Sequence, residues 1–226
     1  MILPPRIMEV LKIIEDLRIN NCEKYLDVGC GDGEITRVIA QRLQAKYTYG
    51  IDKNVKRLQK AAKKGIKVFK LDLNREKFPF PNNYIDVITS LEVIEHLENP
   101  DNMLKEIHRV LKPSGFFILS TPNLASWTNR VWLLLGAQPT YCEVSTEIAI
   151  PSLLEHSPKL RRPMGHIRLF TLHALKYVLM YHGFNVVKVV GSSSTRNIHK
   201  LVYCLDVLIG KINPSLARII IILAKK

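Results

Sequence analysis

The sequence YLDVGCGDGE at Tyr25–Glu34 decides how this chain folds. It begins with a short, mostly apolar stretch typical of a buried strand, Tyr25–Val28, and continues with glycines at alternate positions, Gly29, Gly31 and Gly33. Apolar side chains then recur at helical spacing, at Ile35, Val38, Ile39 and Leu43. A strand, a glycine turn and a helix in this order open a doubly wound α/β domain. Glycine permits the φ angles of the turn and lets a ligand approach bare backbone, beside the unpaired N–H groups of the helix N-terminus.

The glycine turn by itself is compatible with nucleotide binding and with an ordinary tight turn. Dinucleotide-binding enzymes use the spacing G-x-G-x-x-G, and Glu34 occupies the position of its last glycine, which disfavours a dehydrogenase. Asp52 follows a second apolar stretch, Tyr47–Ile51, where an acidic residue accepts ribose hydroxyls in more than one class of enzyme.

Further elements favour one family. The G-x-G-x-G spacing, with Asp27 ahead of it, resembles motif I of the class I S-adenosylmethionine-dependent methyltransferases. The sequences DLN at 72–74, LEVIEHL at 91–97 and VLKPSG at 110–115 follow in the order of that family. Together with GHIRLFT at 165–171, they resemble its small-molecule branch, similar to the ubiquinone-biosynthesis O-methyltransferases. The resemblance covers residues 25–123 and resumes at residues 165–190.

The resemblance implies a Rossmann-like fold and S-adenosylmethionine as the cofactor. Asp52 would accept the ribose hydroxyls and Asp72 would face the adenine amino group. The residues expected to bind the cofactor are Asp27, Gly29, Cys30, Gly31, Gly33, Asp52, Lys53, Asp72, Leu73, Leu91 and Glu92.

Hydrophobic spacing predicts the remaining elements. Helices are expected within residues 1–20 and at Glu34–Gln44, Asn54–Lys64, Asn99–Lys112, Leu172–His182, with Thr171 as its N-cap, and His199–Ile212. Further strands are expected at Ile66–Leu71, Tyr84–Ser90, Phe116–Ser120, Asn185–Val190 and Arg218–Ala224. We therefore expect one domain, residues 1–226, with a doubly wound, seven-stranded, mostly parallel sheet. The family resemblance implies that its last strand is antiparallel.

Two histidines are candidate general bases for the methyl acceptor, His96 and His166, because an imidazole has an ordinary pKa of about 6.5. His156 is a less well placed candidate. His96 could instead have only a structural role at the start of a helix. Glu92, Glu95 and His96 are also suitable donors for a divalent ion, but no distant ligand is apparent and no metal is predicted.

An insertion at residues 124–164 is expected to cap the substrate pocket. It holds both tryptophans, Trp127 and Trp132, next to Leu133–Leu135. These side chains either pack a lid helix onto the domain, or form an apolar wall for the acceptor, or contact a membrane surface. Sequence alone does not separate these three interpretations.

The chain has a net charge of +13, with its lysines and arginines spread widely. A solvated basic surface is favoured over binding to RNA or acidic lipid, because no sequence motif of an RNA-binding module is present. The start of the chain lacks the apolar core of a signal peptide, and no two of its four cysteines form a C-x-x-C pair, so we expect a cytoplasmic protein. The favoured function is methylation of an oxygen, or a nitrogen, of a small molecule. Methylation of RNA, tRNA or protein, and a non-catalytic cofactor-binding subunit that activates a partner, are the alternatives.

Overall fold

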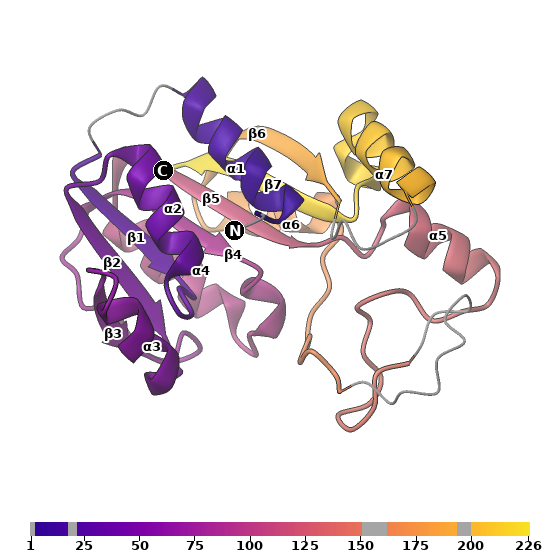
Figure 1. The fold of residues 1–226 in the computed structure, drawn as a ribbon, viewed down its shortest axis with the longest axis horizontal. Coiled ribbons are helices and arrows are strands. Elements are labelled where there is room, and N and C mark those ends of the chain that lie inside the picture. The colour runs from indigo at the N-terminus through magenta and orange to yellow at the C-terminus, as the bar shows by residue number, and fades with distance from the viewer. Residues whose placement is uncertain (1–2, 18–21, 151–161, 194–199) are drawn as a thin grey trace.

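The fold is a seven-stranded sheet with helices on both faces (Figure 1). The computed structural model describes residues 3–17, 22–150, 162–193 and 200–226. The strand order is β3-β2-β1-β4-β5-β7-β6, and β7 runs antiparallel to both of its neighbours while the other pairs are parallel. The strands are β1 (Lys24–Val28), β2 (Tyr47–Asp52), β3 (Lys67–Lys70), β4 (Ile85–Leu91), β5 (Leu111–Pro122), β6 (Asn185–Ser192) and β7 (Ile219–Lys225). The predicted doubly wound, mostly parallel sheet with an antiparallel last strand is confirmed.

Two apolar cores lie on opposite faces of the sheet. The helices are α1 (Pro5–Asp16), α2 (Glu34–Leu43), α3 (Val55–Ala62), α4 (Pro100–Val110), α5 (Trp127–Leu134), α6 (Leu172–Tyr181) and α7 (Lys200–Ile212). Helices α1 and α2 pack on one face, and α4 and α6 pack on the other (Figure 1). Strand β7 supplies Ile219 and Ile221 to the first core and Ile220 and Ile222 to the second, which explains why its sequence is continuously apolar.

The predicted boundary between α4 and β5 is wrong. The helix ends at Val110, and β5 begins at Leu111 rather than at Phe116. Pro113 disfavours helical geometry at Lys112, and Leu111 pairs with Ile85 of β4, so the segment is extended from its start. The other strands and helices lie within a few residues of their predicted positions, and Thr171 is confirmed as the N-cap of α6 because its Oγ1 accepts the Ala174 N–H.

Three expectations touch residues outside the described part. The helix expected within residues 1–20 is described as Pro5–Asp16, while residues 1–2 and 18–20 lie outside. His156 and residue 199, the predicted start of α7, also lie outside the described residues. In the part of the chain that is described, no helix has both the length and the hydropathy that a membrane span requires.

Candidate functional site

A cavity of about 460 Å³ lies at the carboxyl ends of the parallel strands, where open α/β sheets bind ligands. The loops after β1, β2, β3 and β4 line it, together with the end of the insertion. Of the predicted site residues, the structure brings together Gly29, Asp52, Lys53, Asp72, Leu73, Glu92 and His96. The cavity has other lining residues that were not predicted from the sequence, and these include Val93, Met164, Gly165 and Ile167.

The glycines after β1 have different roles. A Cβ at Gly29 would lie 2.3 Å from Cγ2 of Val93, and a Cβ at Gly33 would lie 2.6 Å from Cδ1 of Ile66, so both positions are closed by packing. A Cβ at Gly31 would meet only Nη1 of Arg57, 3.9 Å away. The backbone at Gly31 is therefore open to a ligand, and its φ of +56° suits glycine.

Asp52 is held in a fixed orientation beside this loop. Its Oδ2 accepts the Gly31 N–H at 3.0 Å, and its Oδ1 accepts the Asn54 N–H at 2.8 Å. Each carboxylate oxygen keeps a further lone pair, so the side chain can still accept two hydroxyl groups of a ribose.

Asp72 is anchored from behind by its own loop. Its Oδ1 accepts both the backbone N–H and the side-chain Nδ2–H of Asn74 at 3.0 Å. The backbone N–H of Asn74 and then its side chain lower the pKa of Asp72, which therefore stays ionised as an acceptor.

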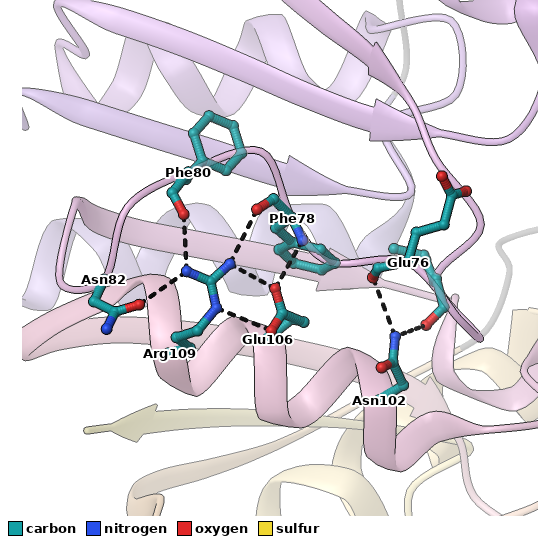
Figure 2. Close-up of polar contacts among 8 residues, drawn as sticks. Glu76, Phe78, Phe80, Asn82, Asn102, Glu106 and Arg109 are labelled. Atoms are coloured by element: carbon teal, nitrogen blue, oxygen red, sulfur yellow. Dashed lines mark hydrogen bonds and ion pairs between the residues drawn. The ribbon is translucent and has the colours of Figure 1, made fainter.

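Helix α4 holds the segment after Asp72 in place (Figure 2). Asn102 donates to the carbonyl oxygen of Leu73 at 2.9 Å, and the Arg109 guanidinium donates to the carbonyl oxygens of Phe78 and Phe80 at 3.0 and 2.8 Å. Glu106 pairs with Arg109 and accepts the Phe78 N–H at 2.7 Å. The Asp72 side of the cavity is thus fixed by residues that no short motif identifies.

Several expected cofactor ligands lie outside the cavity lining. Asp27 is buried behind the glycine turn, where Thr36 Oγ1 and Thr89 Oγ1 donate to its carboxylate at 2.5 and 2.7 Å. Burial raises its pKa to about 6, against the opposing effect of these two hydrogen bonds. Gly31, Gly33, the buried Cys30 and the half-buried Leu91 do not line the cavity either. The structure therefore gives Asp27 a position from which it supports the loop.

The far end of the cavity has a pair of histidines. The rings of His96 and His166 are 4.8 Å apart between centroids, although only His96 lines the cavity. His96 Nδ1 lies 2.9 Å from the carbonyl oxygen of Gly165, which can only accept, so Nδ1 carries a proton and Nε2 of the neutral ring has a free lone pair. Burial, and then the proximity of His96, lower the pKa of His166 and favour its neutral form.

Two glutamates lie beneath the histidines. Ser120 Oγ donates to Glu92 at 2.8 Å, and Thr121 Oγ1 donates to the fully buried Glu95 at 3.0 Å. Burial raises the pKa of both carboxyl groups, and the charge of Glu92 raises that of Glu95 further, to about 8.

One acid and two histidines have the donor types for a divalent ion. Glu95, His96 and His166 each place one donor atom within 4.8 Å of the others. The possible metal ligands that lie together are therefore Glu95, His96 and His166, and not the set with Glu92 that the sequence suggested. Because Glu95 favours its neutral form, a cation would have to displace a proton there, and the absence of a metal stays a prediction.

The insertion is anchored to the histidine end by one carboxylate. Glu143 accepts the backbone N–H groups of Met164, Gly165 and His166, the last two at 2.8 and 2.9 Å. Although burial opposes ionisation, these three hydrogen bonds lower the pKa of Glu143 and keep it charged. The structure therefore places His166 through a residue that lies more than 20 positions away.

The chain is similar in sequence to known proteins. Residues 6–189 match the methyltransferase domain family. The ubiquinone biosynthesis O-methyltransferase of Pseudomonas aeruginosa is 36% identical over 108 residues, 45% of each chain. That of Histophilus somni is 32% identical over 127 residues, 51% of each chain. The matched region thus spans about half the length of these curated relatives.

Solved structures agree with the fold. An S-adenosylmethionine-dependent methyltransferase from Mesorhizobium loti superposes with a TM-score of 0.62 at 18% identity, over 96% of each chain. Another, from Archaeoglobus fulgidus, gives a TM-score of 0.60 at 18% identity, over 97% of this chain and 94% of the other. The bare backbone at Gly31 and the carboxylates of Asp52 and Asp72 fit the cofactor of these enzymes. The chain therefore belongs to the methyltransferase domain family, within the class I S-adenosylmethionine-dependent methyltransferases.

Proposed function

We propose that this protein transfers the methyl group of S-adenosylmethionine to an oxygen or nitrogen atom of a small molecule bound beside His96. One observation carries the proposal: Asp52, which accepts the Gly31 N–H, and His96, whose ring lies beside that of His166, line the same cavity. A cofactor held by Asp52 and Asp72 and an acceptor held at His96 would then meet without a large rearrangement.

The chain's own residues supply binding, orientation and proton removal. The cofactor, when bound, provides an activated methyl carbon for an in-line displacement. Asp52 would hold the ribose, and the loop at Gly31 would lie against the methionine part. His96 Nε2 would accept the proton of the acceptor's hydroxyl or amino group, because its Nδ1–H is already committed to Gly165.

His166 and Glu95 would support this base. A neutral His166 beside His96 lets His96 accept a proton without repulsion between two cations. The buried carboxyl group of Glu95 lies within 4.8 Å of both imidazoles and can lose its proton when a neighbouring positive charge appears.

The proposal is tested in two steps. First, methyl-labelled S-adenosylmethionine is incubated with the protein and a cell extract, and labelled small molecules are identified by mass spectrometry. Second, His96→Ala is assayed on the acceptor found. Turnover should fall by roughly 10²–10⁴-fold, while cofactor affinity, measured by calorimetry, should stay nearly constant.

His173→Ala is the matched control, because His173 is an exposed histidine on α6 outside the cavity lining. Unchanged turnover in His96→Ala would show that His96 has only a structural role. Label found only in RNA, tRNA or protein would replace the small-molecule acceptor by a macromolecule. Cofactor binding without any labelled product would support the activator-subunit alternative.

A further inference from the structure

Exposed apolar side chains are concentrated in the C-terminal part of the chain. Sixteen of the nineteen exposed large hydrophobic residues within the described residues lie after residue 123. Two of the three most exposed lie on neighbouring helices, with Leu134 on α5 at 86% exposure and Ile212 on α7 at 75%, and the third is Tyr181 on α6. A concentration of this kind indicates an interaction surface rather than the scattered apolar residues of an ordinary exterior.

The two helices form a single surface. Helix α7 packs beside strand β6, at the end of the sheet opposite α3, and α5 lies next to it (Figure 1). The buried carboxylate of Asp206 on α7 accepts the indole N–H of Trp127 on α5 at 2.6 Å, and it pairs with Arg218 at 2.8 Å. We call the exposed large apolar residues of these helices, together with Leu135 at the end of α5, the α5–α7 surface: Val131, Leu133, Leu134, Leu135, Leu205, Leu208 and Ile212.

On α7 the exposed apolar residues follow helical spacing. Leu205, Leu208 and Ile212 recur every three to four positions and therefore share one face. The exposed Lys211 lies between the last two of them. An apolar stripe flanked by a lysine is typical of a helix that lies in a lipid–water interface.

Positive charge is concentrated in the same part of the chain. Residues 124–226 contain thirteen lysines and arginines against four acidic residues, whereas residues 1–123 contain twenty against sixteen. On α5 and α7 themselves, the charged side chains described as exposed are Arg130 and Lys211, both positive, whereas the acidic Asp206 is buried.

We propose that the α5–α7 surface docks on a lipid bilayer that contains anionic headgroups. The bilayer accepts both features at once, because its headgroups attract the basic side chains and its acyl boundary accepts the exposed leucines. A nucleic acid would use the charge but would leave the leucines in water. A second copy of the chain would cover the leucines but would bring like charges together. The docking does not depend on which acceptor is methylated.

The two tryptophans provide a direct test, because the chain has no others and both lie on α5. The full-length protein is mixed with vesicles of phosphatidylcholine alone, or with about one third phosphatidylglycerol. Binding is measured by co-sedimentation. In parallel, tryptophan fluorescence is recorded with lipids that are brominated along the acyl chain, which quench only tryptophans that reach the acyl region.

Binding and quenching are expected with the phosphatidylglycerol vesicles and should weaken as salt is raised. The variant Leu134→Ser/Leu135→Ser/Leu208→Ser/Ile212→Ser should lower vesicle partitioning by about tenfold or more. Its substituted side chains are exposed, so its circular dichroism spectrum should stay native. The matched control is Tyr47→Ser/Val55→Ser, which removes exposed apolar groups at the other end of the sheet and should bind like the unmodified protein.

Three results would overturn the proposal. The first is no sedimentation with either kind of vesicle. The second is salt-sensitive binding without quenching that the serine substitutions leave unchanged, since charge alone would then account for the binding. The third is a dimer in gel filtration that the serine substitutions dissociate, because the α5–α7 surface would then be an interface between copies.

Discussion

Replacing Asp27 by asparagine should change how the stability of this protein depends on pH. The Asp27 carboxyl group is buried, and burial raises its pKa from an ordinary 3.8 to about 6. The folded chain therefore binds this proton more tightly than the unfolded chain does. Stability from this group is fully present below pH 3.8 and is lost as the pH rises to about 6. Asparagine has no proton to lose, so Asp27→Asn should lack this loss.

The size of the effect follows from the pKa shift. A difference of about two pKa units corresponds to about 3 kcal/mol in the free energy of unfolding. The amide also changes the hydrogen bonds, because Thr36 and Thr89 both donate to the carboxylate and one of them would face an NH₂ group instead. That mismatch costs about 1 kcal/mol at every pH. Only the titration makes the difference between the two proteins vary with pH.

The assay is urea unfolding of both proteins at pH 4, 5, 6 and 7.5. The difference in unfolding free energy should move in favour of Asp27→Asn by up to about 3 kcal/mol between pH 4 and 6 and then level off. Other titrating groups, such as Glu95, are shared by both proteins and cancel. A difference that is constant with pH would refute the raised pKa. Cofactor affinity at pH 7.5 should change little, and a loss as large as that of Asp52→Ala would show that Asp27 contacts the cofactor directly.

The remaining predictions concern the cavity. Gly31→Val should abolish cofactor binding in calorimetry while the circular dichroism spectrum stays native, because the added side chain would enter the open space beside the loop. Asp52→Ala should weaken cofactor binding at least tenfold, since hydrogen bonds to a charged acceptor contribute about 1.5–3 kcal/mol each. Asp72→Ala should weaken cofactor binding less, because Asp72 is expected to accept from one amino group whereas Asp52 is expected to accept from two hydroxyl groups. A larger loss of affinity at Asp72 would show that Asp72 contributes more to cofactor binding than Asp52 does. His166→Ala should raise the Michaelis constant for the acceptor if His166 positions the acceptor, whereas a lower maximal rate would identify it as a second base. Glu143→Gln, with one carbonyl oxygen for three N–H donors, should raise the same Michaelis constant and leave cofactor affinity unchanged.

The sequence predicted those parts of the structure that depend on local spacing. Glycines at alternate positions, apolar runs and acidic residues at strand ends located β1, β2 and the carboxyl edge of the sheet, because strands and their following turns are specified by neighbouring residues. Asp52 and Asp72 follow two such strands, and both line the cavity as this topology requires. The antiparallel direction of the last strand was predicted from the family resemblance, since an apolar run such as Ile219–Ala224 does not indicate the direction of a strand in the sheet.

Long-range contacts account for what the sequence did not predict. Asp27 was grouped with the cofactor ligands, but its burial depends on Thr89, which comes from a strand more than 60 positions away. Asn102 and Arg109 hold the segment after Asp72, yet their spacing on α4 is that of any polar helix face. The early start of β5 required knowledge that Leu111 pairs with Ile85. Each of these facts concerns partners that come together only in the folded chain.

The histidine end of the cavity follows from backbone hydrogen bonds between two distant segments. The carbonyl oxygen of Glu95 accepts the N–H groups of Ile167 and Arg168 at 2.8 and 3.0 Å, and Gly165 accepts from His96 in return. Backbone atoms therefore set both the distance between the histidines and the tautomer of His96. Apart from changes at Glu143, which holds Gly165 and His166, side-chain changes earlier in the insertion leave these atoms in place, so they should alter which acceptor fits without moving the base. We therefore expect proton removal and acceptor choice to depend on different parts of the chain, although both would act in the same cavity.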